Sequence, residues 1–90
     1  MLRISESSLN GKEATLRLEG SVVGPWVEEV RKACEQLLGA SRALTLDLAD
    51  VSFADRDGIV LLHELNSRAV RLVNCSPFLN EQLKSAEENR

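Results

Sequence analysis

The chain has 90 residues, a formal net charge of −3 at pH 7, 43% apolar residues and 28% charged residues. A chain of this length and composition forms one domain with one modest core. The acidic balance disfavours nucleic acid as a partner, because binding to phosphates requires a basic surface. No apolar run approaches the roughly 20 residues of a membrane-spanning helix, and MLRISESSLN lacks the apolar region of a signal peptide. We therefore expect a single cytoplasmic domain over residues 1–90, with no direct membrane insertion.

Cysteine and histidine are too sparse to indicate a metal or redox site. Cys34 and Cys75 lie far apart and form no Cys-x-x-Cys motif, and His63 is the single histidine. We expect two reduced thiols, no metal and no cofactor.

The first two elements are predicted to form a β-hairpin. Residues 1–6 and 14–19 alternate between apolar and polar side chains, as half-buried strands do. Asn10-Gly11 between them favours a tight turn, because both residues tolerate positive φ. We expect these strands to be antiparallel neighbours.

Gly24-Pro25 opens a predicted helix, since proline is well tolerated in a first turn. Apolar residues recur at helical spacing as far as Leu38, and Gly39 is the expected C-terminal cap. Trp26, at the start of this helix, allows two interpretations: a core anchor or a partner contact.

The second half of the chain alternates strands and helices. Residues 43–48 predict a third strand, and a helix beginning at Asp57 or Gly58 follows, with Leu61, Leu62, Leu65 and Ala69 along one side. Residues 69–74 predict a fourth strand. Ser76-Pro77 begins a short last helix that we expect to reach about Ala86, with residues 83–90 as a frayed polar tail. The order β-β-α-β-α-β-α predicts an α/β fold with a mixed four-stranded sheet: an antiparallel N-terminal hairpin, then a parallel β-α-β-α-β part, with helices packed on the sheet.

Asp55, Arg56, Asp57 and Gly58 lie at the expected carboxyl end of the third strand, where open α/β sheets usually bind ligands. A catalytic acid pair is disfavoured, because no nucleophile or base accompanies the two carboxylates. A phosphate site is disfavoured as well, because Asp57 places negative charge at the helix N-terminus. Asp55 or Asp57 is expected to cap the helix, and Gly58 to permit a close approach of the chain.

The segment LTLDLADVSFADRDGIVLLHEL resembles the signature of STAS domains, the fold of bacterial anti-sigma-factor antagonists. The residues in step with that signature are Asp47, Leu48, Val51, Ser52, Phe53, Asp55 and Gly58. The resemblance continues in LRLEGSVVGPWVEEV, where Gly20 matches the glycine after the second strand, and in AVRLVNCSPFLNEQL.

The resemblance implies a position for a phosphorylation switch. In STAS antagonists the residue before the glycine is commonly a serine or threonine that a partner kinase phosphorylates, and the unphosphorylated form binds that kinase, an anti-sigma factor. That position is Asp57 here, and Arg56 stands where a serine often precedes it. Asp57 has no hydroxyl group, so we expect no switching by phosphorylation there. Val23 is a second departure, because family members often carry an acidic residue at that position.

Three functions are compatible with these patterns. The first is a non-catalytic regulatory module that binds a protein, such as a kinase-type anti-sigma factor. The second is a constitutive STAS subunit that braces the ATPase of a bacterial lipid ABC transport complex. A weak nucleotide sensor is the third, disfavoured by the acidic loop. We expect no enzymatic activity and at most a weak homodimer. The candidate partner-binding residues are Asp55, Arg56, Asp57, Gly58, Val60, His63, Glu64 and Trp26.

Overall fold

The computed structural model of the chain describes residues 2–10, 12–40 and 43–88. Met1 and Gly11, which the sequence assigns to the first strand and its turn, lie outside this part. The described elements are β1 (Leu2–Asn10), β2 (Glu13–Val22), α1 (Pro25–Gly39), β3 (Ala43–Ala54), α2 (Arg56–Ser67), β4 (Arg71–Val73) and α3 (Pro77–Glu88). The predicted element order is thereby confirmed.

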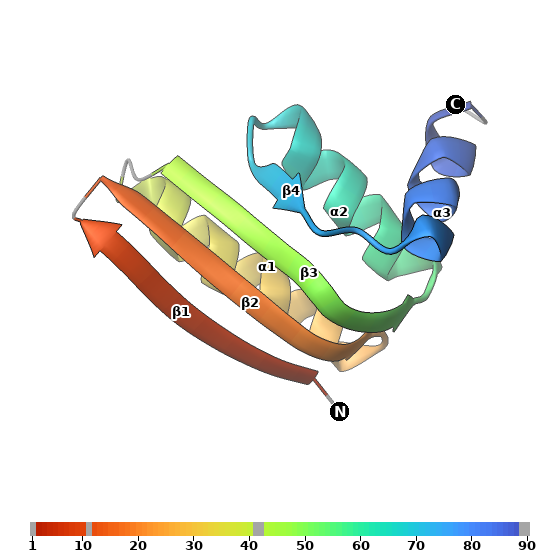
Figure 1. Cartoon of the computed structure of the whole chain (residues 1–90), viewed down its shortest axis with the longest axis horizontal. Coiled ribbons are helices and arrows are strands. Elements are labelled where there is room, and N and C mark those ends of the chain that lie inside the picture. Colours follow the sequence, from red (N-terminus) through yellow and green to blue (C-terminus); the bar gives the residue numbers. More distant parts are fainter. Residues whose placement is uncertain (1, 11, 41–42, 89–90) are drawn as a thin grey trace.

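The sheet has the strand order β1-β2-β3-β4. β1 and β2 are antiparallel, whereas β2, β3 and β4 run parallel, so the predicted mixed sheet is also confirmed. Figure 1 shows α1 and α2 behind this sheet and α3 beside α2, at the end remote from β1. Fully buried side chains between the sheet and the helices include Leu18, Leu46, Leu48, Val30, Leu61 and Leu62.

β3 continues six residues beyond the predicted end at Leu48. The alternation of buried residues breaks there: Leu44, Leu46 and Leu48 are two residues apart, but the next buried residues are Val51 and Ala54. Two register irregularities in the pairing with β2 allow this spacing, because a bulge changes which side chain faces the core. The longer strand carries the chain directly to Asp55.

The prediction that Ala69 lies on the buried side of α2 is wrong. α2 ends at Ser67, and Ala69 is exposed in the left-handed region with φ 69°. The Ala69 N–H donates to the Asn66 carbonyl and the Val70 N–H to the Leu65 carbonyl, while Val70 and Leu65 are both buried. This is a Schellman motif, in which an apolar contact accompanies the two hydrogen bonds. The turn therefore occupies the start of the predicted fourth strand, and β4 begins only at Arg71.

The other two helix ends also differ from expectation. Gly39 is the last residue of α1, with Ala40 at the C-cap and no positive φ at either residue. α3 extends to Glu88, slightly beyond the predicted end at about Ala86, and the fraying of residues 83–90 stays a prediction. Leu83 is half-buried and packs against the core, which holds that part of the helix in place.

Candidate partner-binding site

Asp55 joins two loops at the carboxyl end of the sheet. One carboxylate oxygen accepts the Gly58 N–H at 2.8 Å and caps α2, as predicted for one of the two aspartates. The other oxygen accepts the Gly24 N–H at 2.9 Å, from the loop between β2 and α1. These backbone hydrogen bonds lower the pKa of Asp55 below its ordinary value, and the bond from Gly24 has a larger effect than the bond from Gly58. A single charged side chain thus fixes the β2–α1 loop to the start of α2.

Gly58 lies in the first turn of α2, buried against the end of β2. A Cβ atom at this position would overlap the Val22 carbonyl oxygen and approach the Ala54 and Val22 side chains at 3.2 Å. The expected close approach of the chain is confirmed, and it explains why glycine occupies this position. The same Val22 carbonyl accepts the Asp55 N–H at 3.2 Å. The end of β2 and the start of α2 are therefore in direct backbone contact.

Two charged side chains stand exposed on this fixed frame. Arg56 and Asp57 form the first turn of α2, and neither side chain makes a hydrogen bond or an ion pair with the described part of the chain. Val60, one turn later, is 51% exposed although it is a large apolar residue. Charges without partners beside an exposed apolar residue are suited to contact with another molecule.

The remaining candidate residues lie around this turn with different surroundings. Glu64 is half-buried and forms an ion pair with Arg31 of α1 at 3.3 Å. His63 is half-buried on the side of α2 that faces α3, where it lines a small hollow with Lys84 and Cys75. Trp26 is half-buried and packs against the core, as the core-anchor interpretation holds. Asp55 to Gly58 and Val60 thus form the compact centre of the candidate site.

The nearby positions singled out by the STAS resemblance have structural partners. Val23 is half-buried in the β2–α1 loop, next to the Gly24 N–H that Asp55 accepts. The Ser52 hydroxyl lies 3.2 Å from the Ser21 hydroxyl and donates to the Gly20 carbonyl at 3.3 Å. Ser76 accepts the Leu79 N–H and caps α3. The Ser52 hydroxyl therefore connects β3 to β2, and the Ser76 hydroxyl stabilises the start of α3.

A groove with a volume of about 610 Å³, which was not predicted from the sequence, lies between α2 and α3. Its lining residues come from two helix faces: Arg56, Ile59 and Val60 from α2, and Phe78, Glu81, Gln82 and Ser85 from α3. We refer to it as the α2–α3 groove. A weak signal for it was present in Phe78-Leu79, because adjacent helical residues point in different directions and one of the two can be left exposed, although both are buried at Leu61 and Leu62 of α2. Leu79 is buried and Phe78 is 57% exposed.

The described residues give no indication of a metal or redox centre. No group of three histidine, cysteine or acidic side chains that could hold a metal ion occurs among them. Cys34 is fully buried, and burial raises the pKa of its thiol to about 11; burial also raises that of Cys75. In the same part of the chain, no helix combines the length and apolar character needed to cross a membrane.

Neither a protein-family model nor a curated protein sequence matches the chain. Solved structures do. The anti-sigma factor antagonist SpoIIAA in its unphosphorylated form aligns with a TM-score of 0.65 and 23% identity, over 91% of this chain and 82% of that one. SpoIIAA in its phosphorylated form, described as a Bacillus cell fate determinant, aligns with a TM-score of 0.67 and 22% identity, over 93% of this chain and 83% of that one. The chain has the STAS fold.

A third structure, that of Mglu, aligns with a TM-score of 0.60 and 26% identity. This alignment covers 76% of this chain and 18% of the Mglu chain. The alignments with SpoIIAA, by contrast, cover most of both chains. The STAS fold expected from the sequence is therefore confirmed over nearly the whole domain.

Proposed function

We propose that this protein is a non-catalytic regulatory module that binds a protein partner through the first turns of α2. The observation that carries the proposal is Asp57: it is exposed, its side chain makes no hydrogen bond or ion pair with the described residues, and it occupies the position that the STAS resemblance assigns to the phosphorylated residue. Arg56 and Val60 add an exposed cation and an exposed apolar contact on the same surface.

In the proposed function, the negative charge that Asp57 places at this surface is permanent. A phosphoserine carries about −1.5 to −2 charges at pH 7 and can be returned to a neutral serine, whereas an aspartate carries about one permanent charge. One solved SpoIIAA structure is of the phosphorylated protein and another of the unphosphorylated protein. In this chain Asp57 would hold a single, partly phosphoserine-like state, so partner binding would not be regulated by phosphorylation at this position.

The partner of this surface is expected to be a kinase-type anti-sigma factor, as the STAS resemblance implies, and the structurally similar SpoIIAA is named as an anti-sigma factor antagonist. A permanent charge at Asp57 is equally compatible with a constitutive complex, in which the domain braces the ATPase of an ABC transport complex. The two possibilities differ in the partner recovered from the native host and in how long the complex lasts. A transport ATPase that stays bound through gel filtration would establish the second.

The test is an affinity series with the purified partner. We expect Asp57→Ser to strengthen binding of a kinase-type anti-sigma factor, because the unphosphorylated STAS form is the binding form, and Arg56→Glu to weaken it, each by about fivefold. Lys32→Glu is the matched control, since Lys32 is exposed on α1 and is neither a candidate partner-binding residue nor a lining residue of the α2–α3 groove. If all three variants bind like the unmodified protein, the surface has been assigned wrongly.

A further inference from the structure

The α2–α3 groove has the lining of a site for a third helix. On α3, Phe78, Glu81, Gln82 and Ser85 follow the spacing i, i+3, i+4, i+7, which is one helix face. On α2, the lining residues Arg56, Ile59 and Val60 follow i, i+3, i+4. Two helix faces side by side offer the groove into which the apolar face of a further helix packs.

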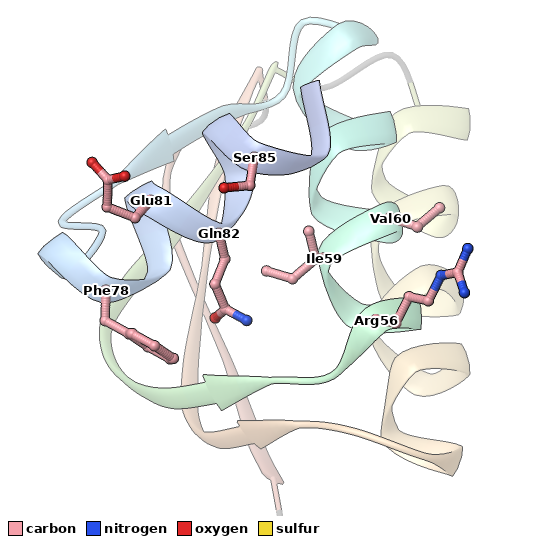
Figure 2. Close-up of a pocket in the computed structure, with 7 residues that line it drawn as sticks. All are labelled: Arg56, Ile59, Val60, Phe78, Glu81, Gln82 and Ser85. Atoms are coloured by element: carbon pink, nitrogen blue, oxygen red, sulfur yellow. The ribbon is translucent and has the colours of Figure 1, made fainter. Parts of the chain in front are cut away.

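The floor of the groove is apolar, with one buried polar atom. Figure 2 shows Ile59, Phe78 and Gln82 pointing into the space between the two helices, whereas Arg56 and Val60, at the α2 rim, point away from α3. Ile59 is 6% exposed, whereas Phe78 and Val60 are more than half exposed. The Gln82 amide nitrogen donates to the Ala54 carbonyl at 3.5 Å, and its carbonyl oxygen is buried without a hydrogen-bond partner. A ligand that supplies a donor there would satisfy it.

The exposed walls of the groove favour a protein partner over a small molecule. A small ligand is usually enclosed on most of its surface. Walls as exposed as Phe78 and Val60 would leave a small ligand largely in water. A helix, by contrast, buries only one face and suits such a surface. The apolar anchors of such a helix would lie at i, i+3 or i+4, and i+7. They would span the same length of helix as the lining residues of α3, from Phe78 to Ser85.

The rims of the groove carry opposite charges. Arg56 lies on the α2 rim and Glu81 on the α3 rim, and neither forms an ion pair within the described part of the chain. Charges at the rim of an interface determine the orientation of a partner more than they increase its affinity. A helix in this groove would therefore place an acidic residue beside Arg56 and a basic residue beside Glu81.

We propose that the α2–α3 groove binds an amphipathic helix of the protein partner, with apolar anchors against Ile59 and Phe78, an acidic flank toward Arg56 and a basic flank toward Glu81. The inference rests on the proposed function, because the groove shares Arg56 and Val60 with the candidate site. It adds the kind of segment that is recognised and a contribution of α3, which lies outside the signature segment LTLDLADVSFADRDGIVLLHEL.

Photo-crosslinking in the native host tests this inference. The photoreactive residue p-benzoylphenylalanine replaces Phe78 in the groove, Asp57 in the first turn of α2, or Lys32 on α1 as the control. Mass spectrometry then identifies the crosslinked protein and the segment. We expect crosslinks from the first two positions but not from Lys32. The segment linked to position 78 should have apolar residues at i, i+3 or i+4, and i+7, with acidic and basic residues on opposite flanks.

The outcomes separate the groove from the proposed function. A partner linked through position 57 but not through 78 overturns the groove inference and leaves the proposed function standing. A second copy of the chain, a lipid or a small molecule linked at position 78 also overturns the groove inference. If neither position 57 nor position 78 links to a protein, both proposals fall.

A synthetic peptide of the crosslinked segment then measures the contribution of each residue by calorimetry. We expect Phe78→Ala to weaken binding about tenfold, as for a central apolar contact, and Arg56→Glu about fivefold, as for a rim charge. Replacing the peptide's acidic flank residue by lysine should restore binding to the Arg56→Glu variant. Asn80→Ala, on α3 outside the groove, is the matched control. Equal affinity of all variants for the peptide would overturn the inference.

Discussion

Asp55 and Asp57 are two residues apart and have different roles. Both oxygens of Asp55 accept backbone N–H groups, from Gly58 and Gly24, so this carboxylate is part of the framework. Asp57 points its charge outward from the same helix turn without such contacts. The framework residue Asp55 and the exposed residue Asp57 of the proposed surface are thus close neighbours in the chain, and Gly58 is the close contact that makes the turn possible.

The Asp55 hydrogen bonds predict a dependence of stability on pH. Because its pKa is lowered in the folded protein, Asp55 contributes stability above its unfolded pKa of about 3.9, and that contribution is lost as the pH falls through the folded pKa. Asp55→Asn keeps an acceptor for Gly58 but directs an amide donor at the Gly24 N–H. We expect the variant to unfold at lower urea concentration at pH 7 and the difference to shrink at pH 3. A difference that stays constant with pH would contradict this role.

Replacing Gly58 by a larger residue is expected to create a steric overlap, whereas the same replacement at Gly39, also in a helix, is not. Gly58→Ala would drive a Cβ atom into the Val22 carbonyl, and we expect a loss of about 1–3 kcal/mol in the free energy of unfolding. Gly39→Ala is the control, because a Cβ atom there meets nothing within 4 Å and alanine favours the helix. Chemical denaturation measures both. Equal stabilities of the two variants would show that the contact between β2 and α2 is looser than described.

At the scale of elements, the turn after α2 shows a local conflict between sequence and conformation. Ala69 occupies the left-handed region at φ 69°, where glycine or asparagine is usual, and the buried pair Leu65 and Val70 holds the turn in place. Asn74, after β4, adopts a similar φ of 59°, and its side chain donates to Asp47. The tertiary contacts of Val70 therefore override the local preference of Ala69.

Ala69→Gly should stabilise the protein. Releasing an alanine from the left-handed region is expected to raise the free energy of unfolding by about 1 kcal/mol and the thermal midpoint by about 5 °C. Ala40→Gly is the control, because Ala40 caps α1 at a negative φ and gains nothing from glycine. Thermal unfolding followed by circular dichroism measures both variants. A loss of stability in Ala69→Gly would mean that the alanine side chain makes a favourable contact there.

At the scale of the whole molecule, the sequence predicts most of the fold, because strand alternation, helix spacing and turn residues agree with the tertiary arrangement. The end of β3 could not be predicted, since the register irregularities opposite β2 arise only when the strands pair. The candidate site was predicted as a location, Asp55 to Gly58. The contact of Asp55 with Gly24 was not, because it joins residues that are 31 positions apart. The α2–α3 groove was missed because it depends on how α3 packs on α2.

Hydrogen exchange shows whether the first turns of α2 form a surface for a protein partner. The measurement compares the free protein with the protein in complex with its purified native partner. We predict that binding protects the β2–α1 loop and the first turns of α2, and leaves exchange on α1 and on the outer sheet residues Arg17 and Asp50 unchanged. Protection confined to the sheet or to α1, with α2 unaffected, would contradict the account.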